Sequence, residues 1–257
     1  DSSYLTFTLP DSVTTIESYA FQSAFKTGGS FTINPTSNLQ TIGDGAFQDC
    51  RTLSSIYIPS TVTSIGSNAF RQNYALTELR NFENCQITEI KSDTFAYASA
   101  LTVLKLPRTV TTINSAFVDN NNLTLVYIPD TVTSIETFYF DGTFENCTSL
   151  TNITLSKSLT STGYRTFKGC TNLSTIIIPD NITEIGGYSF EGCTKLSNIT
   201  LSKNLIKMDS FAFAKCTGLT AITIPSKVTT IGNYAFRGNT ALKRFYYPSK
   251  VSNFGTG

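Results

Sequence analysis

The sequence predicts an α/β solenoid, in which short strands stack coil upon coil into one parallel sheet and short helical turns lie behind it. One observation is a phenylalanine that recurs at nearly constant spacing, and the other is an apolar strand pattern that accompanies each copy. Successive phenylalanines are 26, 23, 25, 22, 27 and then four times 23 residues apart. They are Phe21, Phe47, Phe70, Phe95, Phe117, Phe144, Phe167, Phe190, Phe213 and Phe236. Such a period is typical of one supersecondary unit stacked on copies of itself.

Each unit contains a strand of the form Leu-x-x-Ile-x-Ile, the signature of a leucine-rich repeat. In the cleanest copy this strand runs from Leu173 to Ile178. Because side chains alternate along a strand, Ile176 and Ile178 face the core and Ile177 faces solvent. The same inward pair recurs as Phe7/Leu9, Phe31/Ile33, Ile56/Ile58, Leu104/Leu106, Val126/Ile128, Ile153/Leu155, Ile199/Leu201, Ile222/Ile224 and Phe245/Tyr247.

The segment that follows each strand predicts tight turns. A glycine, asparagine or aspartate comes shortly before the phenylalanine in seven copies, and we expect a left-handed backbone there. These residues are Gly43, Gly66, Asn114, Gly163, Gly186, Asp209 and Gly232. A small residue, most often alanine, directly precedes the phenylalanine, which favours a short α-helical or 3-10 turn on the convex side.

The repeats form a single leucine-rich-repeat domain over residues 1–257, with about eleven coils of roughly 23 residues. We expect a curved, right-handed horseshoe with its parallel sheet on the concave face. The unit at Leu79 is degraded, because Asn81 occupies its second inward slot, and the unit over residues 136–144 is stretched. The chain opens inside a strand and closes within a unit, whereas solenoids ordinarily carry polar caps. We therefore interpret it as a fragment of a longer protein that lacks its caps.

The repeat resembles the BspA-like, or treponema-type, leucine-rich repeats. Their unit reads Leu-x-x-Ile-x-Ile-Pro-x-x-Val-Thr-x-Ile-Gly-x-x-Ala-Phe-x-x-Cys, and the match covers nearly all of residues 4–254. The resemblance implies a surface or secreted protein of mucosal bacteria or parasitic protists that attaches to host matrix, other microbes or host receptors. It supplies no conserved catalytic residues.

Composition excludes several classes of function. The formal net charge is +1, so no strong field would attract nucleic acid. The sequence contains no His and no Trp, which removes imidazole acid–base chemistry and histidine metal ligation. No apolar run approaches the ~18 residues of a membrane span, and no signal peptide is recognisable. We expect no enzyme activity, cofactor, metal site or membrane contact within this segment, and an export signal or anchor outside it.

A column of cysteines and asparagines lies three residues after the phenylalanines. Its members are Cys50, Asn73, Asn120, Cys147, Cys170, Cys193, Cys216 and Asn239. We interpret this column as a structural ladder of buried groups that meet the backbone of the neighbouring coil, and we expect free thiols because the side chains point the same way. Cys85 lies outside the ladder, either as a half-buried loop thiol or as an exposed, reactive one.

The solvent-facing strand column is the candidate ligand site. It carries Tyr57, Arg80, Lys105, Tyr127, Ile177 and Tyr246, and the first four are expected to be consecutive neighbours. Tyrosines beside cations are favoured at binding patches, where aromatic rings and arginine supply most of the energy. The alternative is that aromatic and β-branched residues occur there because they suit strands.

The aromatic insertion Phe138-Tyr139-Phe140 is a second candidate, because three adjacent aromatics cannot all face inward. Its alternative is local repacking in which two of the rings are buried.

The sequence thus favours a non-enzymatic adhesion protein, located at the cell surface or secreted. The concave sheet would bind a host extracellular-matrix protein, a cell-surface protein or a glycan. The alternatives are a structural spacer or self-associating coat component and, third, an enzyme.

Overall fold

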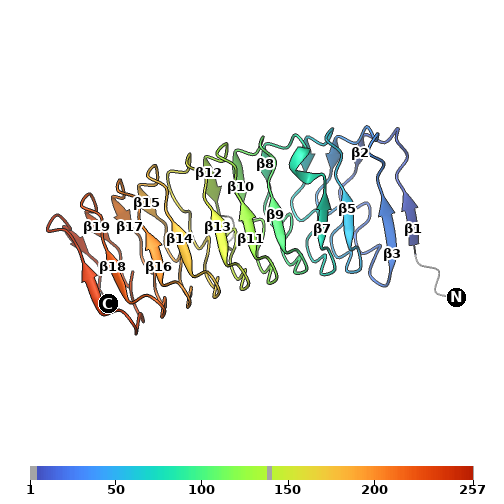
Figure 1. Ribbon diagram of the computed structural model, residues 1–257. Helices are drawn as coiled ribbons and strands as arrows, with labels where there is room; N and C mark the ends of the chain where they lie inside the picture. Colours follow the sequence, from blue (N-terminus) through green and yellow to red (C-terminus); the bar gives the residue numbers. More distant parts are fainter. Residues whose placement is uncertain (1–4, 138–140, 257) are drawn as a thin grey trace.

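The computed structural model describes residues 5–137 and 141–256 of the 257-residue chain. These residues form an elongated stack of coils, each lying against the next from the N-terminal to the C-terminal end (Figure 1). Every described strand pair is parallel and joins equivalent residues of successive coils, as Ile176 pairs with Ile199. The inserted aromatics Phe138, Tyr139 and Phe140 lie outside the described residues.

One series of strands supplies one strand to each of eleven coils. Its members are β1 (Leu5–Thr8), β3 (Gly29–Thr32), β5 (Ser55–Tyr57), β7 (Glu78–Arg80), β9 (Val103–Lys105), β11 (Leu125–Tyr127), β13 (Asn152–Thr154), β14 (Thr175–Ile177), β16 (Asn198–Thr200), β18 (Ala221–Thr223) and β20 (Arg244–Tyr246). We call the solvent-facing side of this series the strand face. The predicted parallel solenoid of about eleven leucine-rich-repeat coils is confirmed.

A second series of very short strands precedes the phenylalanines, around which the sequence predicted helical turns. It consists of β2 (Thr15–Ile16), β4 (Thr41–Ile42), β6 (Ser64–Ile65), β8 (Glu89–Ile90), β10 (Thr112–Asn114), β12 (Ser134–Glu136), β15 (Glu184–Ile185), β17 (Lys207–Met208), β19 (Thr230–Ile231) and β21 (Asn253–Phe254). Within the described residues the sole helix is η1 (Phe82–Asn84), a 3-10 helix that directly follows β7. The α/β class and the convex helices are therefore wrong.

Hydrogen bonding between coils explains why no helix forms around the phenylalanines. The N–H of Phe70 donates to the carbonyl of Thr94 in the next coil at 2.8 Å, and that of Gln72 donates to Ala96 at 2.9 Å. The N–H groups of Ala69 and Arg71 instead donate to carbonyls three residues back in their own coil. Asn68 and Gln72, on either side of Phe70, have left-handed φ angles of 58° and 61°. An α-helix would use all these donors internally, whereas here alternate donors join the coils.

The predicted left-handed positions are also wrong, with one exception. Gly163 has a positive φ of 78°, but Gly43, Gly66, Asn114, Gly186, Asp209 and Gly232 do not. Glycine serves a different purpose at these positions. A Cβ atom on Gly66 would lie 2.4 Å from the backbone nitrogen of Asp44 in the preceding coil. The close approach of two backbones, not the turn, favours glycine there.

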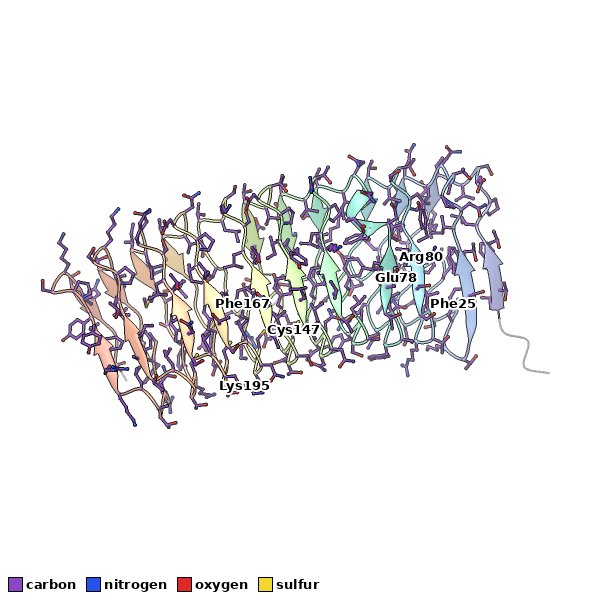
Figure 2. The ribbon with its side chains drawn as sticks, viewed as in Figure 1. Phe25, Glu78, Arg80, Cys147, Phe167 and Lys195 are labelled. Carbon is purple, nitrogen blue, oxygen red and sulfur yellow. The ribbon has the colours of Figure 1, made fainter. Side chains whose placement is uncertain are left out.

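The interior of the stack is a continuous column of phenylalanine rings. The ten predicted residues, from Phe21 to Phe236, stack ring on ring with centroid separations between 5.1 and 5.9 Å and interplanar angles of 20° or less. Those from Phe47 to Phe213 are fully buried; Phe167 is labelled in Figure 2. Full burial of such a side chain contributes about 1.5–3 kcal/mol, and each ring pair adds about 0.5–1.5 kcal/mol.

The degraded unit is completed by the 3-10 helix. Asn81 adopts a left-handed conformation with φ 64°, and its side-chain amide donates to the carbonyl of Ile58 at 2.9 Å. The helix then carries Phe82 into the core, where it is 1% exposed and its ring centroid lies 5.4 Å from that of Phe95. An apolar side chain one residue later thus fills the space that Asn81 leaves.

Tyr247, which the sequence predicts to face inward, is not buried. Its side chain is 58% exposed, and Phe245 beside it is only partly buried. Both belong to the last strand-bearing coil, which is covered by a described neighbour on the β18 side alone. With a described coil on one side alone, these large rings of the end coil stay partly exposed.

Replacement of Phe190 by alanine should lower the free energy of unfolding by about 3–5 kcal/mol, because a buried ring leaves a cavity between two others. Its ring centroid lies 5.3 Å from that of Phe167 and 5.1 Å from that of Phe213. Urea unfolding followed by circular dichroism measures the loss. The control is Ile177→Ala, at a position 68% exposed, which should stay within about 0.5 kcal/mol of the parent. Equal losses in the two variants would contradict the account.

Two glycine substitutions separate close approach from backbone conformation. Gly66→Ala should cost about 1–3 kcal/mol, because the new methyl group forces two coils apart. Gly192→Asn should cost less than about 1 kcal/mol, because asparagine tolerates the left-handed region. At Gly192 the nearest atom to an added Cβ is 3.8 Å away, and Asn146 holds the equivalent position two residues after its phenylalanine. The midpoints of thermal unfolding measure the two losses of stability. A larger loss in Gly192→Asn than in Gly66→Ala would contradict the role of close backbone approach.

Candidate functional site

The strand face presents one row of outward side chains across the coils. Threonine is the commonest residue in this row, and the departures from it are the six predicted ligand-binding residues: Tyr57, Arg80, Lys105, Tyr127, Ile177 and Tyr246. Arg80, Lys105, Tyr127, Ile177 and Tyr246 are exposed, and Tyr57 is partly buried. The row therefore concentrates cationic, aromatic and aliphatic side chains on an otherwise threonine-rich surface.

The structure brings the first four of these residues together as two pairs. Tyr57 pairs with Arg80 across β5 and β7, and Lys105 pairs with Tyr127 across β9 and β11. Strands β7 and β9 belong to different hydrogen-bonded groups, and η1 directly follows β7. A small cavity of about 190 Å³ lies at this break. The four residues lie in four successive coils, and strand hydrogen bonding joins them as two pairs.

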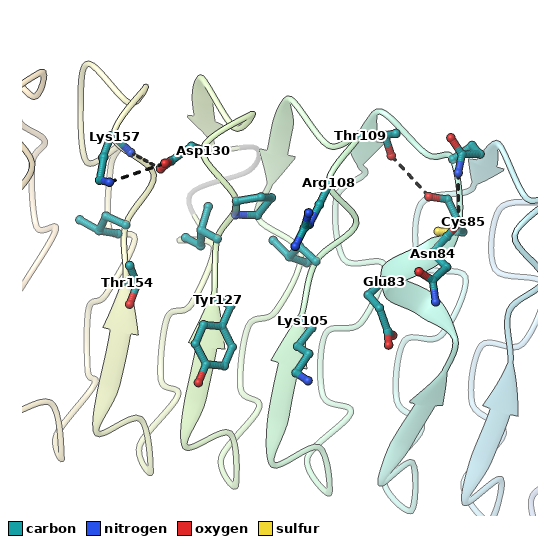
Figure 3. Close-up of a pocket in the computed structure, with 15 residues that line it drawn as sticks. Glu83, Asn84, Cys85, Lys105, Arg108, Thr109, Tyr127, Asp130, Thr154 and Lys157 are labelled. Atoms are coloured by element: carbon teal, nitrogen blue, oxygen red, sulfur yellow. Dashed lines mark hydrogen bonds and ion pairs between the residues drawn. The ribbon is translucent and has the colours of Figure 1, made fainter.

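A larger groove of about 880 Å³ opens over β9, β11 and β13 (Figure 3). Lys105, Tyr127 and Thr154 stand side by side along its strand floor. Side chains from the turns after these strands and from η1 complete the lining: Glu83, Asn84, Arg108, Asp130 and Lys157. We call this cavity the Tyr127 groove. It places an aromatic ring that is 48% exposed between basic groups.

Charge pairing in the Tyr127 groove is incomplete. Asp130 accepts a hydrogen bond from the backbone N–H of Lys157 at 2.9 Å, and its carboxylate lies 3.9 Å from the Lys157 ammonium. Lys105 and Arg108 form no ion pair with any other residue that the structure describes. Two cations therefore border the groove with their charge available to a ligand.

A second groove of about 710 Å³ adjoins the first and extends over β14 and β16. Both are lined by Thr154, Leu155 and Lys157, so they form one trough along the stack. Its floor carries Ile177, which is 68% exposed, and Asp180 lies at its border. The Lys203 ammonium, 2.7 Å from Asp180, holds the pKa of that carboxyl below its usual value.

Sequence reasoning missed the charged residues that follow the strands. Arg108, Asp130, Lys157, Asp180 and Lys203 occupy equivalent places in five successive coils and alternate in charge. Aligning the coils on their strands would have revealed this column, but strand alternation says nothing about where turn residues point. Tyr246 lies on β20 and lines neither part of the trough.

The cysteine and asparagine column joins the coils through their backbones. Cys147, Cys170, Cys193 and Cys216 each donate from Sγ to the carbonyl of the phenylalanine one coil before, at 3.1–3.3 Å. Cys50 bonds to Phe21 in the same way, and the amides of Asn73 and Asn120 bond to Phe47 and Phe95. Asn239, in contrast, has no hydrogen-bond partner for either side-chain atom.

All six cysteines are free and buried, including Cys85. The interpretation of Cys85 as half-buried or exposed is wrong, because it is 1% exposed and packs in the core. Burial raises the pKa of Cys85 to about 11 and that of Cys216 to about 12. Thiols in this state are poor nucleophiles, so these side chains serve packing.

The described residues contain neither a metal-binding cluster nor a membrane-spanning helix. No group of three or more Cys, Asp or Glu residues within them is arranged to hold a metal ion. No described helix is long and apolar enough to cross a membrane.

The stack of Leu-x-x-Ile-x-Ile coils defines a leucine-rich-repeat solenoid. The chain belongs to the BspA-type leucine-rich-repeat family, whose repeat model matches residues 1–27, 22–143 and 140–257. No curated protein matches the sequence.

Solved structures of bacterial proteins share this fold. A leucine-rich repeat protein from Bacteroides ovatus is 25% identical, with a TM-score of 0.54 over 98% of this chain and 83% of its own. A leucine-rich cell surface protein from Faecalibacterium prausnitzii is 21% identical, with a TM-score of 0.53 over 94% and 87% of the two chains. The pneumococcal vaccine antigen PcpA is 23% identical, with a TM-score of 0.59 over 97% of this chain and 58% of its own.

Stability should fall as the pH rises above about 9. Burial raises the folded-state pKa of the thiols above their ordinary value of 9.0, so they keep their protons when unfolded thiols have lost them. The unfolded state then binds fewer protons, and unfolding becomes easier between pH 9 and about 11–12. Iodoacetamide labelling provides the test: we expect all six thiols protected at pH 8 and protection declining above pH 9. Rapid labelling of any thiol in the folded protein at pH 8 would contradict the burial.

Proposed function

We propose that this chain is a non-enzymatic recognition protein of a bacterial cell surface that binds a host or microbial protein or glycan through its strand face. The observation that carries the proposal is the trough over β9 to β16. There two cations without ion-pair partners among the described residues adjoin an exposed tyrosine and an exposed isoleucine. Aromatic and arginine side chains dominate binding energy at protein interfaces. Aromatic and β-branched residues also suit strands, but strand preference does not account for the cations beside them.

Family membership and the solved structures support the location. A structure with the same fold is that of a leucine-rich cell surface protein, and another is that of a pneumococcal vaccine antigen. Stacked repeats suit this role, because they present an extended surface on a rigid frame. The composition supports the absence of catalysis, since a chain without histidine lacks the commonest general acid–base group.

The experiment is a pull-down against extracellular-matrix proteins together with a glycan array, both with the full chain immobilised. For a ligand found in this way, the double variant Tyr57→Ala/Tyr127→Ala should lose roughly tenfold or more in affinity, measured by biolayer interferometry. The matched control is Thr32→Ala/Thr223→Ala, which changes the same row at β3 and β18. Equal affinities of the two double variants would reject the strand face as the binding surface, and scattering that shows growth into assemblies without ligand would favour the coat component instead.

A further inference from the structure

The trough has two chemically different ends. At one end, Lys105 and Arg108 border the Tyr127 groove, and neither has an ion-pair partner among the described residues. At the other end, Ile177 is 68% exposed on β14 and lies in register with Thr200 on β16. Tyr127 and Thr154 lie between the two ends on β11 and β13. A ligand that fills the trough therefore contacts positive charge at one end and an aliphatic side chain at the other.

The spacing between these ends follows from the coil repeat. Lys105 and Ile177 occupy the same row three coils apart, on β9 and β14. Hydrogen-bonded strands lie about 4.8 Å apart, and β13 and β14 are in contact although they share no hydrogen-bonded ladder. With a similar step between β13 and β14, the two positions are roughly 14 Å apart. An extended peptide rises about 3.3 Å for each residue, so four residues span roughly 13 Å. Residues four apart in an extended segment also project on the same side.

The negative groups of the trough determine which of its cations can bind an acidic ligand. Glu83 on η1 lines the Tyr127 groove beside Lys105 (Figure 3). Asp130 is engaged with Lys157, and Asp180 with Lys203. An incoming carboxylate is therefore attracted by Lys105 and Arg108 and repelled by Glu83. Arginine is suited to this role, because its planar guanidinium can bind both oxygens of a carboxylate.

Ile177 favours a peptide over a sugar. Its side chain has neither a hydrogen-bonding group nor a ring against which a sugar could stack, and threonine occupies this row in the neighbouring coils β13 and β16. An aliphatic or aromatic side chain of a ligand would remove its apolar surface from water, which is worth about 25 cal/mol for each Å² buried.

We propose that the trough binds an extended acidic segment of a partner protein that runs along the stack across the strands. The segment carries Asp or Glu against Lys105 and Arg108, and an aliphatic or aromatic residue four positions away against Ile177. This inference rests on the proposed recognition function and names the ligand class of the same surface.

The test uses the full chain and synthetic nine-residue peptides with a fluorescent label in a glycine–serine background. The lead peptide has a glutamate and a leucine four residues apart, and binding is measured by fluorescence anisotropy at low salt. A peptide with these residues three apart places the two side chains on opposite sides and should bind roughly tenfold more weakly. Replacement of the glutamate by glutamine should cause a similar loss.

Protein variants test each contact separately. Lys105→Ser/Arg108→Ser and Ile177→Thr should each weaken the lead peptide roughly tenfold, whereas Glu83→Gln should strengthen it by a factor of about two or more. The control is Thr223→Ser on β18, outside the trough, which should leave binding unchanged. Circular dichroism confirms that each variant is folded.

Three outcomes would overturn the inference: no measurable binding of the lead peptide, equal binding of the peptides with three and four residues of spacing, or insensitivity to the Lys105 and Ile177 changes. Selective binding of acidic glycans on the array, without peptide binding, would also overturn it. In that case the proposed function is still supported if replacement of Tyr127 lowers the affinity for the glycan. If peptide and array ligands alike bind without regard to the strand-face variants, the proposed function fails as well.

Discussion

Contact between successive coils is the constraint on which the rest of this structure depends. A single coil exposes its phenylalanine and its strand isoleucines on both sides and has no means of covering them. The next coil covers them with the same residues, so ring stacks on ring from Phe21 to Phe236. The exposed Tyr247 shows what happens where a described neighbour is missing.

The same contact selects residues that look unrelated in the sequence. Glycine at positions such as Gly66 lets two backbones approach, and the buried cysteines bond to the phenylalanine carbonyl of the preceding coil. Left-handed residues on both sides of nine of the ten phenylalanines turn alternate N–H groups toward the next coil, and Phe144 has such a residue, Asn146, on its C-terminal side alone. Close packing of backbones, hydrogen bonding and ring stacking therefore all act along the stack direction, and the outward row of the strand face takes no part in them.

The sequence predicts the parts of the fold that depend on local pattern. The Phe column and the alternation from Leu173 to Ile178 suffice for the stack, the strands and the solvent-facing row. The turn conformation around Phe70 could not be predicted, because the N–H groups of Phe70 and Gln72 donate to carbonyls of another coil, those of Thr94 and Ala96. The helix η1 could not be predicted, because the repeat pattern assigns the core position to Asn81, whereas the next residue, Phe82, fills it.

The candidate site divides in the same way. Alternation along the strands identifies Tyr57, Arg80, Lys105, Tyr127 and Ile177 as solvent-facing. It does not reveal the ladder break between β7 and β9, nor that Arg108 and Lys157 reach the groove from the turns. Turn side chains take their direction from the backbone of each coil, which a repeat pattern alone does not fix. The adjoining grooves, and the cations in them that lack ion-pair partners in the described part of the chain, become apparent only when the coils are stacked.

Deletion of one whole coil tests the central claim most directly. Removal of residues 168–190 joins Phe167 to Glu191 and leaves every other coil in register. We expect a cooperatively folded protein whose circular dichroism spectrum is that of a β protein. Its maximum dimension from small-angle scattering should be shorter by about 4.8 Å. Removal of residues 168–179, about half a coil, should disrupt the stack on its C-terminal side. If both deletions unfold the chain to the same extent, the coil is not the unit on which this structure is built.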